Sequence, residues 1–131
     1  MIVLDTHAWV WFVGDPDRLS RPARAAIQGS LSDASIHVSS ISCWEVAILV
    51  KKGRLELSMD VAEWVDRAAS LAFLRFVPVD NRIAVGAVHL AAPLHDDPAD
   101  RIIVATALSL RATLVTKDRR LRRYRAVRTI W

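Results

Sequence analysis

The sequence contains one cysteine, Cys43, and no uninterrupted apolar run long enough to span a bilayer. A single thiol excludes an internal disulfide framework and a cysteine-based zinc site, so we expect Cys43 to be a packing residue. The first residues reach Asp5 without a basic leader, which is unlike a secretory signal. We therefore expect a cytoplasmic protein with no membrane segment.

Linkers, internal repeats and low-complexity segments are also absent from the 131 residues. Hydrophobic residues make up 53% of the chain and charged residues 24%, which suits one packed core and leaves no room for a second. We therefore predict a single domain over residues 1–131.

Positive charge is concentrated late in the chain. The 18 basic and 14 acidic residues give a formal net charge of +4. Much of the surplus lies in Lys117, Arg119, Arg120, Arg122, Arg123, Arg125 and Arg128. Such a segment is either a solvated surface or a phosphate-binding surface, and the charge alone leaves both interpretations open.

Short strand-like apolar runs alternate with segments of helical spacing along the whole chain. The predicted strands are 2–4, 36–39, 74–79, 113–116 and 126–130. The predicted helices are 6–13, 20–31, 42–51, 58–68, 81–92 and 98–110, followed by a short basic turn or helix. This alternation predicts an α/β fold, a three-layer α/β/α sandwich with a mainly parallel sheet.

The stretch from His95 to Ala107 places acids at the start of a helix. Asp97 is expected to cap it, Pro98 suits its first position, and Asp100 falls in the first turn. The helix is then apolar on nearly every side, as in a helix packed inside a domain. Asp100 is therefore held at the end of a buried helix, either as part of the helix start or as a ligand for a cation.

Three other acids are expected at the same edge of the sheet. Asp5 and Asp118 follow predicted strands, and Glu45 opens the helix after the second strand. These positions lie at the carboxyl ends of the strands, where parallel sheets bind their ligands. Converging carboxylates repel and raise one another's pKa, so such a cluster indicates cations among them. Oxygen ligands without a cysteine partner favour Mg²⁺ or Mn²⁺.

Each acid also has a purely structural explanation. Ser42 and Glu45 have the spacing of a capping box, and Asp5 and Asp118 can each cap the turn after a strand. No histidine shows metal-ligand spacing, although His95 lies near the proposed site. Four tryptophans at helical spacing are expected in the core or a dimer contact rather than as base-stacking platforms: Trp9, Trp11, Trp44 and Trp64.

Four short motifs follow one another along the chain: Asp5-Thr6-His7-Ala8-Trp9 with Trp11, Ser42-Cys43-Trp44-Glu45-Val46-Ala47, Asp97-Pro98-Ala99-Asp100-Arg101, and Thr116-Lys117-Asp118. Together they resemble the motifs of PIN-domain proteins, and above all of the VapC-type toxins of bacterial toxin–antitoxin pairs. The resemblance covers the whole chain at the family's length. It implies a PIN-like fold.

The resemblance also implies a site and an activity. Asp5, Glu45, Asp100 and Asp118 match the acidic quartet that binds Mg²⁺ or Mn²⁺, and Thr116 matches the supporting polar residue. The implied activity is a metal-dependent RNA endonuclease, the toxin of a type II toxin–antitoxin system, that hydrolyses phosphodiester bonds with a metal-activated water. The candidates for holding the RNA backbone are Lys117, Arg119, Arg120, Arg122 and Arg123.

Partners follow from the same resemblance. It implies a homodimer, a VapB-type antitoxin whose tail blocks the site, and contact with operator DNA only through the antitoxin complex. The chain departs from the family at two positions. Asp96 stands where a basic residue is usual and Ala99 where an aromatic is usual, which affects substrate contacts and leaves the four acids intact.

Two other functions deserve comparison with this one. A phosphatase with an aspartate nucleophile needs a second aspartate two residues after the first, where this chain has His7 after Asp5. A non-cleaving PIN-like module would bind RNA, or operator DNA together with a partner. The intact acidic quartet argues against that module.

Overall fold

The computed structural model describes residues 1–131 and has at its centre a sheet of five strands, all parallel to their neighbours. The strands are β1 (Ile2–Leu4), β2 (Ile36–Ser39), β3 (Leu74–Val77), β4 (Thr113–Val115) and β5 (Thr129–Ile130). Their order across the sheet is β3-β2-β1-β4-β5. The predicted mainly parallel sheet is confirmed, with no antiparallel member.

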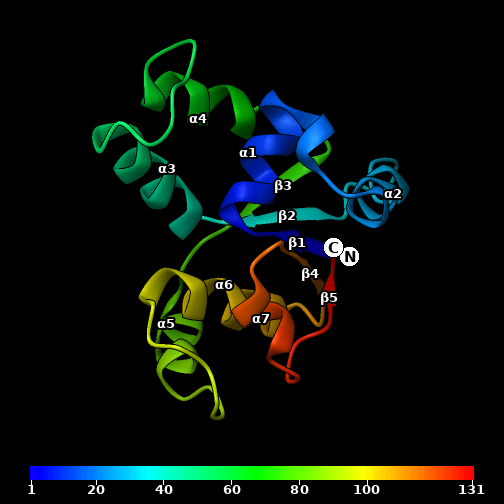
Figure 1. Cartoon of the computed structure of the whole chain (residues 1–131), viewed down its shortest axis with the longest axis vertical. Helices are drawn as coiled ribbons and strands as arrows, with labels where there is room; N and C mark the ends of the chain where they lie inside the picture. Colours follow the sequence, from blue (N-terminus) through cyan, green and yellow to red (C-terminus); the bar gives the residue numbers. More distant parts are fainter.

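Helices cover both faces of this sheet (Figure 1). They are α1 (Thr6–Gly14), the 3-10 turn η1 (Pro16–Arg18), α2 (Arg21–Gly29), α3 (Ile41–Lys51), α4 (Val61–Ala69), α5 (Asn81–Val88), α6 (Pro98–Ser109) and α7 (Arg119–Arg123). In Figure 1, α1, α3 and α4 lie above the sheet, and α5, α6 and α7 lie below it. This arrangement confirms the predicted three-layer α/β/α sandwich.

The alternation of side chains along β1 divides the core in two. Ile2 and Leu4 pack on the side of Trp9, whereas Val3 packs on the side of Ile103 in α6. Trp9 is fully buried, as expected, and its ring contacts those of Trp64 and Phe76. Cys43 is free and packs against the same cluster, which confirms its packing role.

Several predicted elements end earlier in the structure than in the sequence pattern. β3 stops at Val77, before Pro78, which has no N–H for a ladder bond. The predicted helix 81–92 stops at Val88. The last strand, in contrast, begins later than predicted and is only Thr129–Ile130 instead of 126–130.

The early end of α5 has a specific cause in Arg101 of α6. Its guanidinium donates to the carbonyl oxygens of Ala87 and Val88 at 2.9 and 3.2 Å, which satisfies the free carbonyls at the end of α5. It also donates to those of Leu94 and His95 at 3.2 and 3.3 Å. Arg101 therefore fixes the segment that leads into the start of α6.

The strand order changes direction at β1. β2 and β3 are added on one side of β1, and β4 and β5 on the other. The residues after β1 and β4 therefore flank the topological switch point, where α/β proteins bind ligands. None of the helices combines the length and apolar character needed to cross a membrane.

Candidate active site

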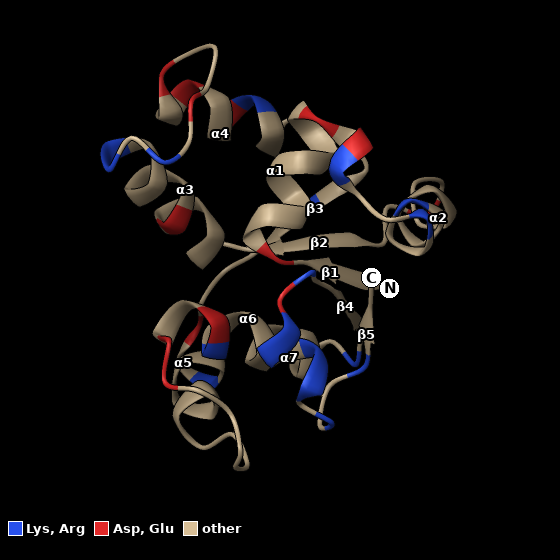
Figure 2. Ribbon diagram, in the orientation of Figure 1, with Lys and Arg blue, Asp and Glu red and all other residues tan.

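A cleft of about 680 Å³ opens at the carboxyl edge of the sheet, next to this switch point. It is lined by Asp5, Thr6, His7, Trp11, Arg18, Glu45, Arg54, Asp97, Asp100, Lys117, Asp118 and Arg120. The four acids singled out in the sequence all line it. In Figure 2, where Asp and Glu are red, the segments that carry these acids lie at the starts of α1, α6 and α7 and within α3.

Asp5 is the most enclosed of the four acids. Its carboxylate caps α1 by accepting the Ala8 N–H at 2.8 Å, so the structural role foreseen for it is real. Burial raises the pKa of Asp5 to about 6, although bonds from Thr116 and Ala8 oppose the shift. Thr116 also accepts the Asp118 N–H at 3.1 Å and so joins two of the acids, as befits a supporting position.

Glu45 lies in the body of α3, which makes the capping-box prediction wrong. α3 begins at Ile41 after Ser40, so Ser42 is already inside the helix and has no cap to form. Thr6 Oγ1 instead lies 2.6 Å from Glu45 Oε1 and 2.9 Å from Ser42 Oγ. Burial raises the pKa of Glu45 to about 7, and the charges of Asp100 and the other acids add to the shift.

Asp100 lies in the first turn of α6, as predicted, and Asp97 caps that helix by accepting the Asp100 N–H at 2.9 Å. His95 Nε2 lies 2.7 Å from Asp100 Oδ2. Burial raises the pKa of Asp100, and the charges of Asp97 and Asp118 act in the same direction while His95 opposes them. Asp97 is thus the cap, and both Asp97 and Asp100 line the cleft.

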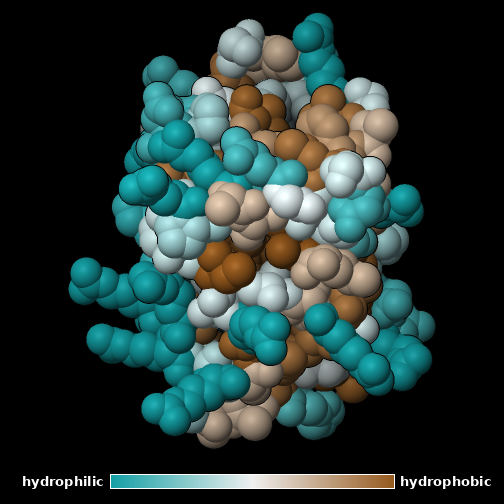
Figure 3. Space-filling model, turned by 90° about the vertical axis from the view of Figure 1, so that its right-hand side faces the viewer, coloured by the Kyte–Doolittle hydropathy of each residue, from teal (hydrophilic) through white to brown (hydrophobic).

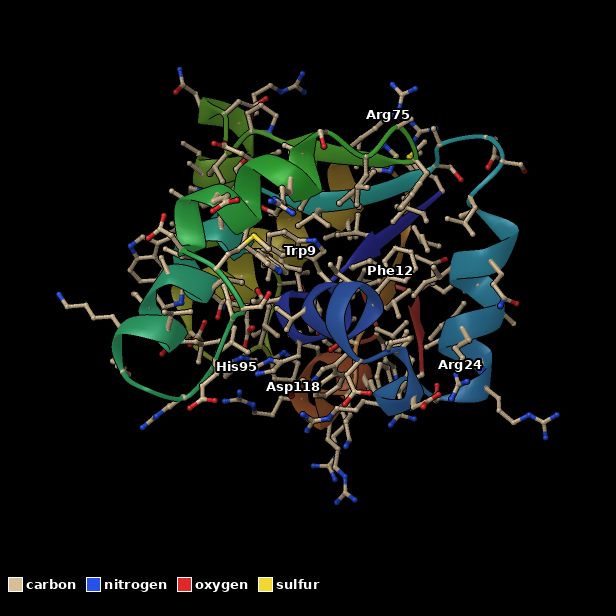
Figure 4. The ribbon with its side chains drawn as sticks, turned by 90° about the horizontal axis from the view of Figure 1, so that it is seen from above. Trp9, Phe12, Arg24, Arg75, His95 and Asp118 are labelled. Atoms are coloured by element: carbon tan, nitrogen blue, oxygen red, sulfur yellow. The ribbon has the colours of Figure 1, made fainter.

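Asp118 caps α7 and contacts Arg120. Arg120 Nη2 lies 3.0 Å from Asp118 Oδ2 and 3.6 Å from Asp100 Oδ2, so one guanidinium spans two carboxylates. Burial raises the pKa of Asp118, but the hydrogen bonds and charge of Arg120 outweigh it and leave that pKa below its usual value. Figure 4 shows His95 and Asp118 along the same edge of the molecule, with Trp9 in the interior.

Cations from outside the basic segment also line the cleft. Arg18 follows α1 and Arg54 follows α3, and neither was foreseen as a site residue. The Arg18 guanidinium lies 4.6 Å from the centroid of the Trp11 ring, and the Lys117 ammonium lies 5.6 Å from it. Trp11, which was expected in the core or a dimer contact, packs half-buried against the core cluster and also lines the cleft.

The donor set suits a hard divalent cation. All four acids offer oxygen, the ligand that such cations prefer. Three of them have raised pKa values, because burial disfavours their charged forms and neighbouring acids add to the effect. No three His, Cys, Asp or Glu side chains are yet grouped closely enough to hold an ion. Asp100 contacts His95 and Arg120, and Asp118 contacts Arg120.

Comparison with known proteins identifies the family of the whole chain. The family model described as "PIN domain" matches residues 2–127. The chain belongs to the PIN domain family. Over 99% of its length and 98% of the relative's, this PIN domain is 38% identical to "Ribonuclease VapC22" of Mycobacterium tuberculosis (strain ATCC 25618 / H37Rv).

Solved structures share the PIN fold at lower identity. The "Crystal structure of VapBC2 from Rickettsia felis bound to a DNA fragment from their promoter" has a TM-score of 0.71 at 18% identity and covers 99% of this chain and 98% of that one. The "Toxin-antitoxin complex from Klebsiella pneumoniae" has a TM-score of 0.66 at 20% identity and covers 100% and 97%. These likenesses confirm the predicted PIN-like fold.

Proposed function

We propose that this PIN domain, residues 1–131, is a divalent-metal-dependent RNA endonuclease and the toxin of a type II toxin–antitoxin pair. The observation that carries the proposal is the meeting of Asp5, Glu45, Asp100 and Asp118, from four distant segments, in one cleft. The 38% identity to a protein named as a VapC ribonuclease, over nearly the whole of both chains, supports the same activity.

Mg²⁺ or Mn²⁺ is the proposed cofactor, in keeping with the general metal dependence of VapC-type PIN ribonucleases. The ion would be held by Asp5, Glu45, Asp100 and Asp118. Binding would require Asp118 to lose its contact with Arg120, and Asp100 to lose its contacts with His95 and Arg120. A divalent cation bound there supplies an activated water and stabilises the charge that builds on the leaving oxygen of a phosphodiester.

The chain's own residues then have separable tasks. Thr6 and Thr116 hold Glu45 and Asp5 in place through their hydroxyls. Arg18, Arg54 and Lys117 lie in the cleft as donors for the phosphates of RNA. No side chain is required as a nucleophile, which agrees with a site in which every acid is a candidate ligand.

The proposed partners are an RNA substrate, a VapB-type antitoxin that blocks the cleft, and a second copy of the chain, all in the cytoplasm. Relatives of similar fold are described as toxin–antitoxin complexes, some of them bound to DNA. Operator DNA is therefore proposed as a ligand of the antitoxin complex. Exposed apolar side chains at Trp44, Val85 and Val88 offer surface for association.

The test of the nuclease proposal is cleavage of a mixed RNA pool by the purified chain, with Mg²⁺, with Mn²⁺ and with excess chelator. Cleavage should need the metal and be lost in Asp5→Asn, which removes a charge and keeps the shape. Undiminished cleavage by Asp5→Asn or in chelator would overturn the metal-nuclease proposal. RNA binding without cleavage under every condition would favour the non-cleaving PIN-like module.

The toxin proposal has its own experiment. Expression of the chain alone should slow growth, and co-expression of the neighbouring antitoxin gene should restore it, whereas Asp5→Asn should be harmless without the antitoxin. A harmless wild-type chain that binds no product of a neighbouring gene would contradict the toxin assignment and leave the nuclease activity standing.

A further inference from the structure

A second hollow of about 560 Å³ borders α7 and shares no lining residue with the acidic cleft. Three α7 arginines, Arg119, Arg122 and Arg123, line it together with Pro22 and residues 129–131. In Figure 3, which looks onto the side of the molecule where α2 and β5 lie, long hydrophilic side chains project from the lower left and apolar surface lies between them. The hollow is therefore basic with an apolar wall.

The three arginines of the hollow have no acidic side chain as a partner. No Asp or Glu lines the hollow, and none of the three forms a salt bridge, although Arg120 beside them forms two. Three like charges held together repel one another, so an anion placed among them lowers the electrostatic energy of the folded protein. Arginine presents a planar fork of N–H donors that matches phosphate oxygens.

An aromatic pair joins this hollow to the acidic cleft. Trp11 lines the cleft and Trp131 lines the hollow, and their ring centroids are 5.8 Å apart. α7 contributes to both sides, since Arg120 faces the acids and Arg119 faces the hollow. Cations and aromatic faces thus follow one another along a continuous surface that starts at the four acids, the arrangement with which proteins bind single-stranded nucleic acid.

We propose that this hollow is a subsite for single-stranded RNA, which takes a nucleotide flanking the phosphodiester in the acidic cleft. The arginines hold the backbone phosphate, and the Trp131 ring offers a face for the base. This proposal rests on the proposed ribonuclease function and adds the path that the RNA takes beyond the acidic cleft. Phosphate contacts set position and not sequence, so the subsite favours longer RNA without choosing bases through the arginines.

The experiment compares cleavage of a dinucleotide with cleavage of a single-stranded RNA of about ten nucleotides, a length within the reach of such surfaces. Arg122→Gln/Arg123→Gln removes two charges from the hollow. Arg125→Gln/Arg128→Gln removes two charges from the same basic segment at exposed residues outside the hollow, and is the matched control. Trp131→Ala removes the aromatic wall, and Trp131→Phe keeps one.

The hollow variants should lower kcat/KM for the longer RNA about tenfold, leave the dinucleotide unchanged, and flatten the dependence of RNA binding on salt. Trp131→Phe should retain most of the activity that Trp131→Ala loses. Equal loss in the control pair, equal loss on both substrates, or a loss of antitoxin binding without any loss on RNA would overturn the subsite. Wild-type protein that cuts neither substrate would instead overturn the proposed function.

Discussion

The Thr6 hydroxyl lies 2.6 Å from Glu45 Oε1, across 39 residues of sequence. Ser42 Oγ lies 2.9 Å from the same hydroxyl, which completes a chain from Ser42 through Thr6 to the acid. Because Thr6 follows Asp5, the start of α1 supplies one acid of the cleft and positions another. The two are therefore held in one geometry by the start of α1.

Replacement of Thr6 by valine keeps the shape and removes the hydroxyl. Glu45 then loses a bond that favours its charged form, so its pKa should rise further above about 7. We expect kcat/KM for RNA to fall about 10- to 100-fold and the rising limb of its pH profile to move to higher pH. Thr6→Ser, which keeps the hydroxyl, should behave like the wild type. An unmoved profile in Thr6→Val would show that Thr6 does not position Glu45.

The metal-free protein should lose stability as the pH rises. The pKa of Asp5 is near 3.8 in the unfolded chain and about 6 in the folded protein, and that of Glu45 is near 4.5 and about 7. At a pH between the unfolded and folded values, the folded state therefore binds more protons than the unfolded state. Their stabilisation is present at acid pH and is lost as pH rises through the folded values. Thermal unfolding in chelator should therefore show Tm falling by on the order of 5 °C between about pH 5 and pH 8.

Two controls accompany this titration. Mg²⁺ should remove most of the fall in Tm, because it compensates the charges that high pH creates. Glu45→Gln should reduce the fall without metal, since its amide does not titrate. A Tm that stays level or rises over this range in chelator would contradict the raised pKa values.

Three acids near the start of α6 should respond differently to amide substitution. Asp97→Asn should cost little stability or activity, because asparagine caps a helix about as well as aspartate. Asp96→Asn should be equally mild. Asp100→Asn removes a charge from the crowded cleft, so the metal-free protein should be at least as stable while RNA cleavage collapses. If Asp100→Asn kept cleavage and Asp97→Asn lost it, Asp97 would be the metal ligand and Asp100 would not.

Arg120 should compete with the metal ion. Its guanidinium stands between Asp118 and Asp100, so Arg120→Gln should raise the affinity for Mn²⁺ about three- to tenfold, measured by calorimetry in the absence of RNA. Arg119→Gln removes the same charge one residue earlier, outside the cleft, and serves as the control. Unchanged or weaker Mn²⁺ binding in Arg120→Gln would show that the arginine does not occupy the ligand positions.

The sequence by itself was sufficient to predict the layers and to bring four candidate acids to one edge of the sheet. Apolar runs such as 2–4 and 36–39 alternate with helical spacing, and burial of those faces leaves few arrangements other than helices on both sides of a parallel sheet. Asp5 and Asp118 could be placed because a residue just after a parallel strand must lie at the ligand-binding edge. These inferences depend only on local spacing and on chain direction, which the sequence contains.

The contacts around the acids were decided by the tertiary structure. Ser42 and Glu45 fit a capping box in sequence, but α3 starts one residue before Ser42, and its position beside α1 gives Glu45 the hydroxyl of Thr6 instead. Trp11 has helical spacing like Trp9, yet only Trp9 is fully buried, whereas Trp11 packs at the border of the core and lines the cleft. Such partners depend on how helices distant in sequence pack and which side-chain rotamers that packing allows, and no local pattern specifies either.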